Sequence, residues 1–225
     1  MLRNEWKHWI TWSTHRRLQT QLRVLLPSDA HGKEYHIRSI YFDTPQGDCS
    51  FEKYSGLERR NKYRMRFYNH NDRIIKLEIK TRIGDRIRKT SAEISRSQAD
   101  ALLNGERLLQ APAKAQPFLS AVKNLSLRPV IVVDYTREAY TYKHGNVRIT
   151  FDKHLRSGLH RGNVFSAALP MFPVHKKNAL ILEVKYNAIL PTMVHRIIAP
   201  MVDGSTDISK YCLCRGLIFP QEELL

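Results

Sequence analysis

The sequence predicts an α+β fold in which an antiparallel sheet dominates. Three observations support this prediction. Charged and apolar residues alternate at the period of a β-strand through residues 62–93, turn residues separate the alternating runs, and stripes of helical period occur elsewhere. The chain has 225 residues, with no internal repeat and no Gly/Ser-rich linker, so we expect a single domain over residues 1–225.

The N-terminal part predicts a strand followed by a helix. Residues 4–11 alternate, and Glu5 and Lys7 share one face of the predicted strand. Ser13 is suited to cap a helix over residues 15–26, whose leucines form an apolar stripe. We expect that stripe to pack against the sheet.

A meander of three strands follows. In residues 62–68 (KYRMRFY), basic residues alternate with apolar and aromatic ones, and residues 76–82 (KLEIKTR) repeat the pattern after a turn at 69–72. A second turn at Gly84-Asp85 leads into the run 86–93. The two turns predict that the three strands are neighbours in an antiparallel sheet.

The C-terminal half predicts further strands and two helices. Alternating or apolar runs predict strands at 128–141, 146–152 and 179–186. Ser95 or Ser97 can cap a helix that ends near Asn104-Gly105, and Pro191 suits the first turn of a helix running towards Ala199.

The net charge of +16 predicts a polyanionic partner. Residues 53–89 carry 13 basic and 4 acidic residues, so the charge is concentrated in the predicted meander. The longest apolar runs are too short to span a bilayer, and charges near the N-terminus argue against a signal peptide. We therefore expect a cytoplasmic protein without a transmembrane helix. The three cysteines fit no redox or zinc pattern and are interpreted as structural thiols.

The charged residues that line one face of each predicted strand have two interpretations. They form either the solvent-exposed face of a sheet or, if the sheet curls with that face inward, the wall of a basic tunnel. Rows made mostly of Lys and Arg would repel each other on an ordinary wet face. Within them, single glutamates recur at E-x-K spacing in Glu5-x-Lys7, Glu78-x-Lys80 and Glu183-x-Lys185. In a tunnel, basic walls would hold phosphates and the carboxylates would hold Mg²⁺ or Mn²⁺.

Eight segments in order along the chain resemble the VTC domain, the polyphosphate polymerase branch of the triphosphate tunnel metalloenzymes. They are RNEWK at 3–7, IRSIYFDT at 37–44, KYRMRFYN at 62–69, KLEIKTR at 76–82, RPVIVVDYTREAY at 128–140, NVRITFD at 146–152, ILEVKYN at 181–187 and SKYCLCR at 209–215. The resemblance implies an eight-stranded antiparallel β-barrel tunnel with peripheral helices. It also implies transfer of the terminal phosphate of ATP to a growing inorganic polyphosphate chain, or to pyrophosphate, with Mn²⁺ or Mg²⁺ as cofactor.

The resemblance also implies roles for residues at matching positions. Catalytic residues would be Lys210, Ser209, Arg64 and Arg66. Substrate-binding residues would be Lys7, Lys62, Lys80, Lys89, Tyr135, Arg137, Arg148 and Lys185. Metal ligands would be Glu183, Glu78 and Glu5, with Glu183 as the principal one. Hydrolytic members of the superfamily commonly begin with E-x-E-x-K, whereas Arg3 stands here at the first Glu, as expected for the polymerase branch.

Simpler readings of single residues stay open. Glu183 could serve merely as an ion-pair partner of Lys185. The carboxylates of Glu5 and Glu78 could serve merely to orient arginines, and Lys210 could be an exposed cation after a loop. Asp152 could be a turn residue after its strand.

Two other functions stay open for the whole chain. One is a hydrolase of triphosphate, polyphosphate or nucleoside triphosphates with the same fold. The other is a non-catalytic module that binds polyphosphate or nucleic acid, although no RNA-binding signature supports nucleic acid. Fungal VTC proteins carry a phosphate-sensing domain and membrane helices that are not found in this sequence. Any membrane coupling would therefore require a separate membrane-protein partner.

Overall fold

The computed structural model describes residues 3–27, 34–84, 86–108, 110–174, 178–204 and 206–219. Its strands are β1 (Asn4–Thr11), β2 (Tyr35–Asp43), β3 (Arg59–Tyr68), β4 (Asn71–Ile83), β5 (Arg86–Ile94), β6 (Arg128–Tyr142), β7 (Val147–Gly158), β8 (Phe172–Pro173) and β9 (Ala179–Tyr186). Within the described ranges they form one sheet of nine strands in the order β1-β9-β7-β6-β2-β3-β4-β5, with β8 paired to β7. Every pairing is antiparallel, as predicted.

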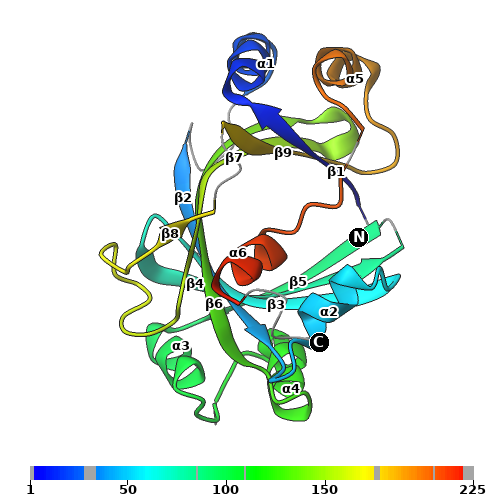
Figure 1. Ribbon diagram of the computed structural model, residues 1–225. Helices are drawn as coiled ribbons and strands as arrows, with labels where there is room; N and C mark the ends of the chain where they lie inside the picture. The colour runs from blue at the N-terminus through cyan, green and yellow to red at the C-terminus, as the bar shows by residue number, and fades with distance from the viewer. Residues whose placement is uncertain are drawn as a thin grey trace.

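The sheet curls until its two edge strands meet at one point, around a central space (Figure 1). Arg3 and Ile87 exchange two backbone hydrogen bonds of 3.1 Å, which form a single bridge between the chain just before β1 and strand β5. Beyond this bridge β1 and β5 are not paired in the described part of the chain, and we call that gap the seam. The expected eight-stranded barrel is therefore a ring of eight long strands that is incompletely closed, with the short strand β8 added outside it.

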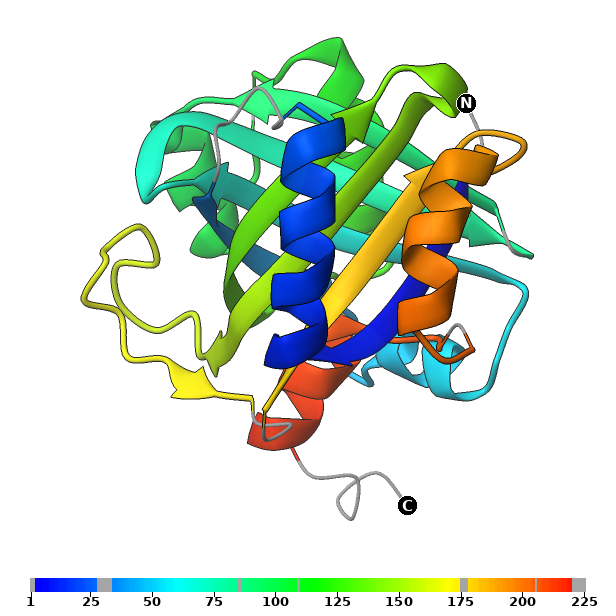
Figure 2. The same cartoon turned by 90° about the horizontal axis from the view of Figure 1, so that it is seen from above.

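The helices are α1 (Trp12–Leu25), α2 (Asp48–Tyr54), α3 (Arg96–Leu103), α4 (Gln116–Asn124), α5 (Thr192–Ile198) and α6 (Lys210–Ile218). Helices α1 and α5 cover the outside of the ring over β1, β9 and β7 (Figure 2), whereas α6 lies within the ring (Figure 1). Short 3-10 turns occur at Ala113–Ala115, His144–Asn146 and Ala199–Met201. None of the helices in the described ranges is both long and apolar enough to span a membrane.

Apolar side chains of the strands are buried in two clusters, under the helices outside the ring and against α6 within it. Leu18 and Leu22 of α1 belong to the same buried cluster as Phe151 of β7 and Leu182 of β9. A second cluster joins β2, β3, β4 and β6 with α3, α4 and α6. Because the helices take up the apolar faces, the charged faces enclose the interior, and the reading as an ordinary wet face is wrong.

Several local predictions need correction. Helix α1 starts earlier than predicted, because Thr11 at the end of β1 caps it, with Thr11 Oγ1 accepting from Thr14 N at 3.2 Å. Of the two predicted caps of α3, Ser95 is confirmed, and it forms a capping box. Strand β7 continues to Gly158, well beyond the predicted end.

Three helices and two strands were not predicted from the sequence pattern. Helices α2, α4 and α6 are short, with seven, nine and nine residues. Strand β8 has only two residues, and strand β2 is buried on both faces and was indicated only by the family resemblance. Cys49, Cys212 and Cys214 are free and buried. Asp85 of the predicted turn lies outside the described residues, and the division into one domain stays a prediction.

Candidate functional site

The ring encloses a cavity of about 370 Å³, bounded by the long strands and by the start of α6. Fourteen of the fifteen predicted site residues line it, and Glu78 is the exception. Among the residues that the structure describes, eleven Lys and Arg side chains line the cavity, against the carboxylates of Glu5 and Glu183. The cavity is therefore strongly electropositive.

Glu78 of β4 does not line the cavity, although its cross-strand partner Arg64 does. Its fully buried carboxylate accepts from Arg64 Nε at 2.7 Å and from Lys89 Nζ at 2.8 Å. Burial alone would raise the pKa of Glu78, but Arg64, Arg66 and Lys89 outweigh burial and hold it well below its ordinary value. This geometry favours the role of orienting the cations over that of a metal ligand.

Tyrosine hydroxyls from nearby strands of the sheet fix three of the cavity arginines. Arg64 Nη1 donates to Tyr41 Oη at 3.0 Å, and Arg66 Nη2 donates to Tyr135 Oη at 3.2 Å. Arg148 Nη2 donates to the hydroxyl of Tyr35 at 2.7 Å. The guanidinium groups are therefore held in position before any ligand binds. Tyr35 and Tyr41 were not predicted, although both lie on the same face of β2.

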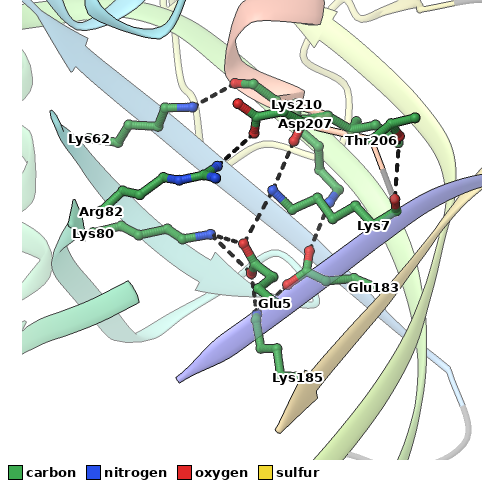
Figure 3. A network of polar contacts seen from close by, with 12 residues as sticks. Glu5, Lys7, Lys62, Lys80, Arg82, Glu183, Lys185, Thr206, Asp207 and Lys210 are labelled. Carbon is green, nitrogen blue, oxygen red and sulfur yellow. Dashed lines mark hydrogen bonds and ion pairs between the residues drawn. The ribbon is translucent and has the colours of Figure 1, made fainter. Parts of the chain in front are cut away.

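Glu5 sits among three lysines on the opposite wall (Figure 3). Its oxygens lie 2.8 and 3.0 Å from Lys80 Nζ, 3.2 Å from Lys7 Nζ and 3.3 Å from Lys185 Nζ. Burial and the nearby charge of Glu183 raise the pKa of Glu5, but the lysines prevail and lower it to about 2. Glu5 is therefore ionised at neutral pH.

The first turn of α6 brings two further predicted residues into the cavity. Ser209 caps the helix by accepting from Cys212 N at 3.2 Å, and it also accepts from Lys62 Nζ at 2.7 Å. Lys210 Nζ lies 2.5 Å from Asp152 Oδ2 and 3.4 Å from Glu183 Oε2. Lys210 is therefore not an exposed cation, and the segment from Lys210 is a helix that points its N-terminus at the cavity.

Burial would lower the pKa of Lys210, but the carboxylates of Asp152 and Glu183 raise it above its ordinary value. Its ammonium therefore stays charged. Glu183 also pairs with Lys185, and its own pKa is held well below the ordinary value by Lys185 and Lys210 despite burial.

Asp152 is the main acidic residue that the prediction of the site missed. It lies within β7 rather than in a turn, and its fully buried carboxylate accepts from Arg137 Nε at 2.6 Å and Nη2 at 2.7 Å. With Lys210 on the same carboxylate, Asp152 links β6, β7 and α6. The sequence did contain a signal for it, because the alternation in residues 146–152 puts Asp152 on the same strand face as Arg148.

The carboxylates can be tested for their fit to a divalent cation. No group of three or more His, Cys, Asp or Glu side chains in the described ranges is placed to hold a metal by itself. Glu183 lies near both Glu5 and Asp152, since it shares Lys185 with the first and Lys210 with the second. One or two oxygen ligands completed by the phosphates of a substrate suit Mg²⁺ or Mn²⁺. The residues therefore fit a metal that arrives with a phosphate ligand, not a closed protein cage.

Comparisons with solved structures identify the fold. The chain is similar to a candidate adenylyl cyclase from Hippeastrum described as having a dominant triphosphatase activity, with 15% identity, a TM-score of 0.57 and 95% of each chain covered. It is similar to a candidate adenylate cyclase from Bacillus halodurans, with 15% identity, a TM-score of 0.58 and 97% of each chain covered. It is also similar to a chain of the Mediator head module from Schizosaccharomyces pombe, with 7% identity and a TM-score of 0.51 over 91% of this chain and 98% of that one.

Likenesses at these identities establish a shared architecture, the triphosphate tunnel fold. A search of curated proteins found no match. The family comparison goes further, because the model of the VTC domain matches residues 2–219, nearly the whole length. The chain belongs to the VTC domain family.

Proposed function

We propose that the protein is a metal-dependent polyphosphate polymerase that transfers the terminal phosphate of ATP to a growing inorganic polyphosphate chain. The observation that carries the proposal is the cavity, in which eleven cationic side chains of the described residues face two carboxylates. Such an excess of buried positive charge needs an anion of high charge density to offset it. Membership of the VTC family supports phosphate polymers as that anion.

The geometry suits phosphoryl transfer, which needs positioning and charge compensation more than covalent chemistry from the protein. Arg64 and Arg66 would hold phosphate oxygens with guanidinium groups fixed by tyrosines. Lys210 and the backbone N–H groups at the start of α6 would meet the transferring phosphoryl group. Glu183, with Glu5 beside it, would hold Mn²⁺ or Mg²⁺, which would neutralise charge on the phosphates when bound.

Cysteine is not placed to act as the nucleophile, because none of the three cysteines, all in the described ranges, lines the cavity. Burial also raises the pKa of the Cys214 thiol to about 12. The attacking group would therefore come from the acceptor, which is inorganic polyphosphate or pyrophosphate. ATP is the proposed donor. Cytoplasmic location and a separate membrane-protein partner stay predictions.

A hydrolase is the second candidate. The structural neighbour from Hippeastrum is described as a triphosphatase, and it shares the tunnel fold with this chain. The two reactions differ only in the acceptor, which is water in one and a phosphate chain in the other. Arg3, which lines the cavity where hydrolytic relatives commonly carry a glutamate, favours the polymerase.

Product analysis separates the candidates. Purified protein is incubated with ATP and Mn²⁺ or Mg²⁺, and products are resolved on a gel that separates phosphate polymers by length. A ladder of polymers that is absent with Glu183→Gln supports the polymerase. Release of ADP and orthophosphate without polymer supports the hydrolase. Binding of polyphosphate without turnover under any metal supports the non-catalytic module.

A further inference from the structure

A short segment, residues 206–209, lies across the seam, and we call it the strap. Its backbone is tied to β1, because Thr206 N donates to the carbonyl oxygen of Lys7 at 2.8 Å. The side chain of Lys7 makes a second contact with the strap, in which Nζ donates to the carbonyl oxygen of Ile208 at 2.8 Å. The strap is therefore tied to β1 at the seam, next to the network of Glu5 and Lys80 (Figure 3).

The side chain of Asp207 in the strap reaches the opposite side of the seam. Its carboxylate lies 2.7 Å from Lys53 Nζ of α2, 2.8 Å from Arg60 Nη2 of β3 and 2.9 Å from Arg82 Nη1 of β4. Burial raises its pKa, but Lys53, Arg82 and Arg60 lower it to about 2, so Asp207 is an anion at neutral pH. Three cations from three elements thus converge on one carboxylate.

We call these three cations the cation cup, and its two arginines are held in place by contacts other than those with Asp207. Arg60 Nη1 donates to the carbonyl oxygen of Leu57 at 2.9 Å, and Arg82 Nε donates to that of Gly84 at 2.7 Å. The side chain of Arg60 is 7% exposed, whereas that of Asp207 is 43% exposed. The cup is therefore a built part of the wall, and the anion in it belongs to the more accessible strap.

The cup adjoins the main cavity. A small space of about 40 Å³ is lined by Arg60, Arg82 and Asp207, and also by Lys62 and Lys80, which line the main cavity as well. Positive side chains therefore continue from the main cavity to the seam. Guanidinium groups arranged around one oxyanion suit a phosphate group as well as a carboxylate.

We propose that the cation cup of Lys53, Arg60 and Arg82 is a phosphate-binding subsite at the seam, and that Asp207 occupies it until a long phosphate chain displaces the carboxylate. This inference rests on the proposed function, since it assumes that the main cavity holds phosphate chains. A short chain fits within the main cavity and leaves Asp207 in place. A chain long enough to reach the seam must compete with Asp207, so Asp207 weakens the binding of long chains selectively.

The test compares Asp207→Asn with Asp203→Asn. Asp203 is exposed, precedes Asp207 by four residues and makes no ion pair with the described part of the chain, so its substitution controls for net charge. Calorimetry measures the affinity of each variant for inorganic tripolyphosphate and for a long polyphosphate, without ATP or metal. Because a freed charge-assisted contact is worth more than about 1.4 kcal/mol, we expect Asp207→Asn to strengthen long-chain binding at least about tenfold. Tripolyphosphate binding should change less than about twofold, as should both affinities in Asp203→Asn.

A double-mutant cycle with Arg82→Gln locates the effect. If Asp207→Asn strengthens long-chain binding by freeing the cup, adding Asp207→Asn to Arg82→Gln should strengthen it much less than adding Asp207→Asn to the wild type. Equal gains for both ligands, or no gain for the long chain, would overturn the proposal and leave Asp207 as a structural clasp. If Asp207→Asn does not fold, Arg82→Gln alone should still weaken long-chain binding more than tripolyphosphate binding, and equal effects would overturn the subsite. Failure of the wild type to bind either ligand would instead refute the proposed function.

Discussion

Among the regions of this protein that bury charged side chains, two have opposite arrangements. One is the main cavity. The other is the Glu138 cluster between α1 and the outer face of the sheet, made of Glu138, His15, Gln19, Tyr140 and Lys153. There the two carboxylate oxygens of Glu138 accept from Gln19 at 2.7 and 2.9 Å, from Tyr140 at 2.5 Å and from Lys153 at 3.2 Å, and lie 3.0 Å from His15.

The contrast separates charge used for stability from charge used for binding. In the Glu138 cluster, one anion is fully supplied with protein donors, so the region needs no ligand and holds α1 on the sheet. Around the cavity, eleven cations of the described residues share few carboxylates, so the protein alone does not balance them. Substitutions in the first region should therefore change stability, and those in the second should change binding and turnover.

The largest expected effect is on turnover. Lys210→Met should lower the rate of phosphoryl transfer by about 10²–10³-fold, because it removes a charge placed on the transferring group. ATP affinity should change little, since the other cavity cations still hold the phosphates. Steady-state kinetics and ATP titration measure the two effects. Lys153→Met in the Glu138 cluster is the matched control and should keep the wild-type rate. Wild-type turnover in Lys210→Met would remove α6 from the active site.

A second effect concerns stability against pH. The pKa of Glu138 is lowered to about 2, because its hydrogen bonds to His15, Tyr140 and Gln19 outweigh burial. A carboxyl with a depressed pKa in the folded state stabilises the protein above its unfolded pKa of about 4.3, and the gain is lost as pH falls towards 2. Urea unfolding of wild type and Glu138→Gln should therefore differ by about 3 kcal/mol at pH 7 and by less at pH 3. A constant difference would contradict this assignment.

The smallest expected effect is on the number of protons that the protein takes up when a phosphate ligand binds. Burial, with repulsion from Lys7, Arg60 and Lys53, lowers the pKa of Lys62 to about 8, so about half of its ammonium is deprotonated at pH 8 in the free protein. A bound phosphate favours the charged form, so binding should take up about half a proton at this site. Lys62→Arg, which stays charged, should reduce the total uptake by that amount. Calorimetry of tripolyphosphate binding in two buffers of different ionisation enthalpy measures it, and unchanged uptake would refute it.

Much of the wall of the cavity was predictable, because the period of a strand decides which residues share a face. The alternation in residues 62–68 places Arg64 and Arg66 together whatever the details of packing. The same pattern does not show whether a carboxylate is a metal ligand or a partner that orients neighbouring cations. Glu78 and Glu183 both occur in E-x-K, but only their surroundings show that the carboxylate of Glu78 is taken up by Arg64 and Lys89 and does not line the cavity.

Contacts between distant segments were not predictable. The cation cup joins Lys53, Arg60 and Arg82 with Asp207, which follows Arg82 by 125 residues. That approach depends on the curl of the sheet and on where the strap crosses the seam, neither of which has a local signal. The strand β2 was missed because it is buried on both faces and therefore lacks alternation.

The most direct test of the contrast is one chemical change made in both regions. Glu183→Gln should lose most turnover but melt near the wild-type temperature, because Lys185 keeps Glu5 and Lys210 keeps Asp152 as partners. Glu138→Gln should keep turnover but melt about 6–12 °C lower, the shift expected for about 3 kcal/mol in a chain of this size. Activity and melting temperature are measured on both variants with saturating Mn²⁺. Retained turnover in Glu183→Gln, or equal melting temperatures in the two variants, would contradict the account.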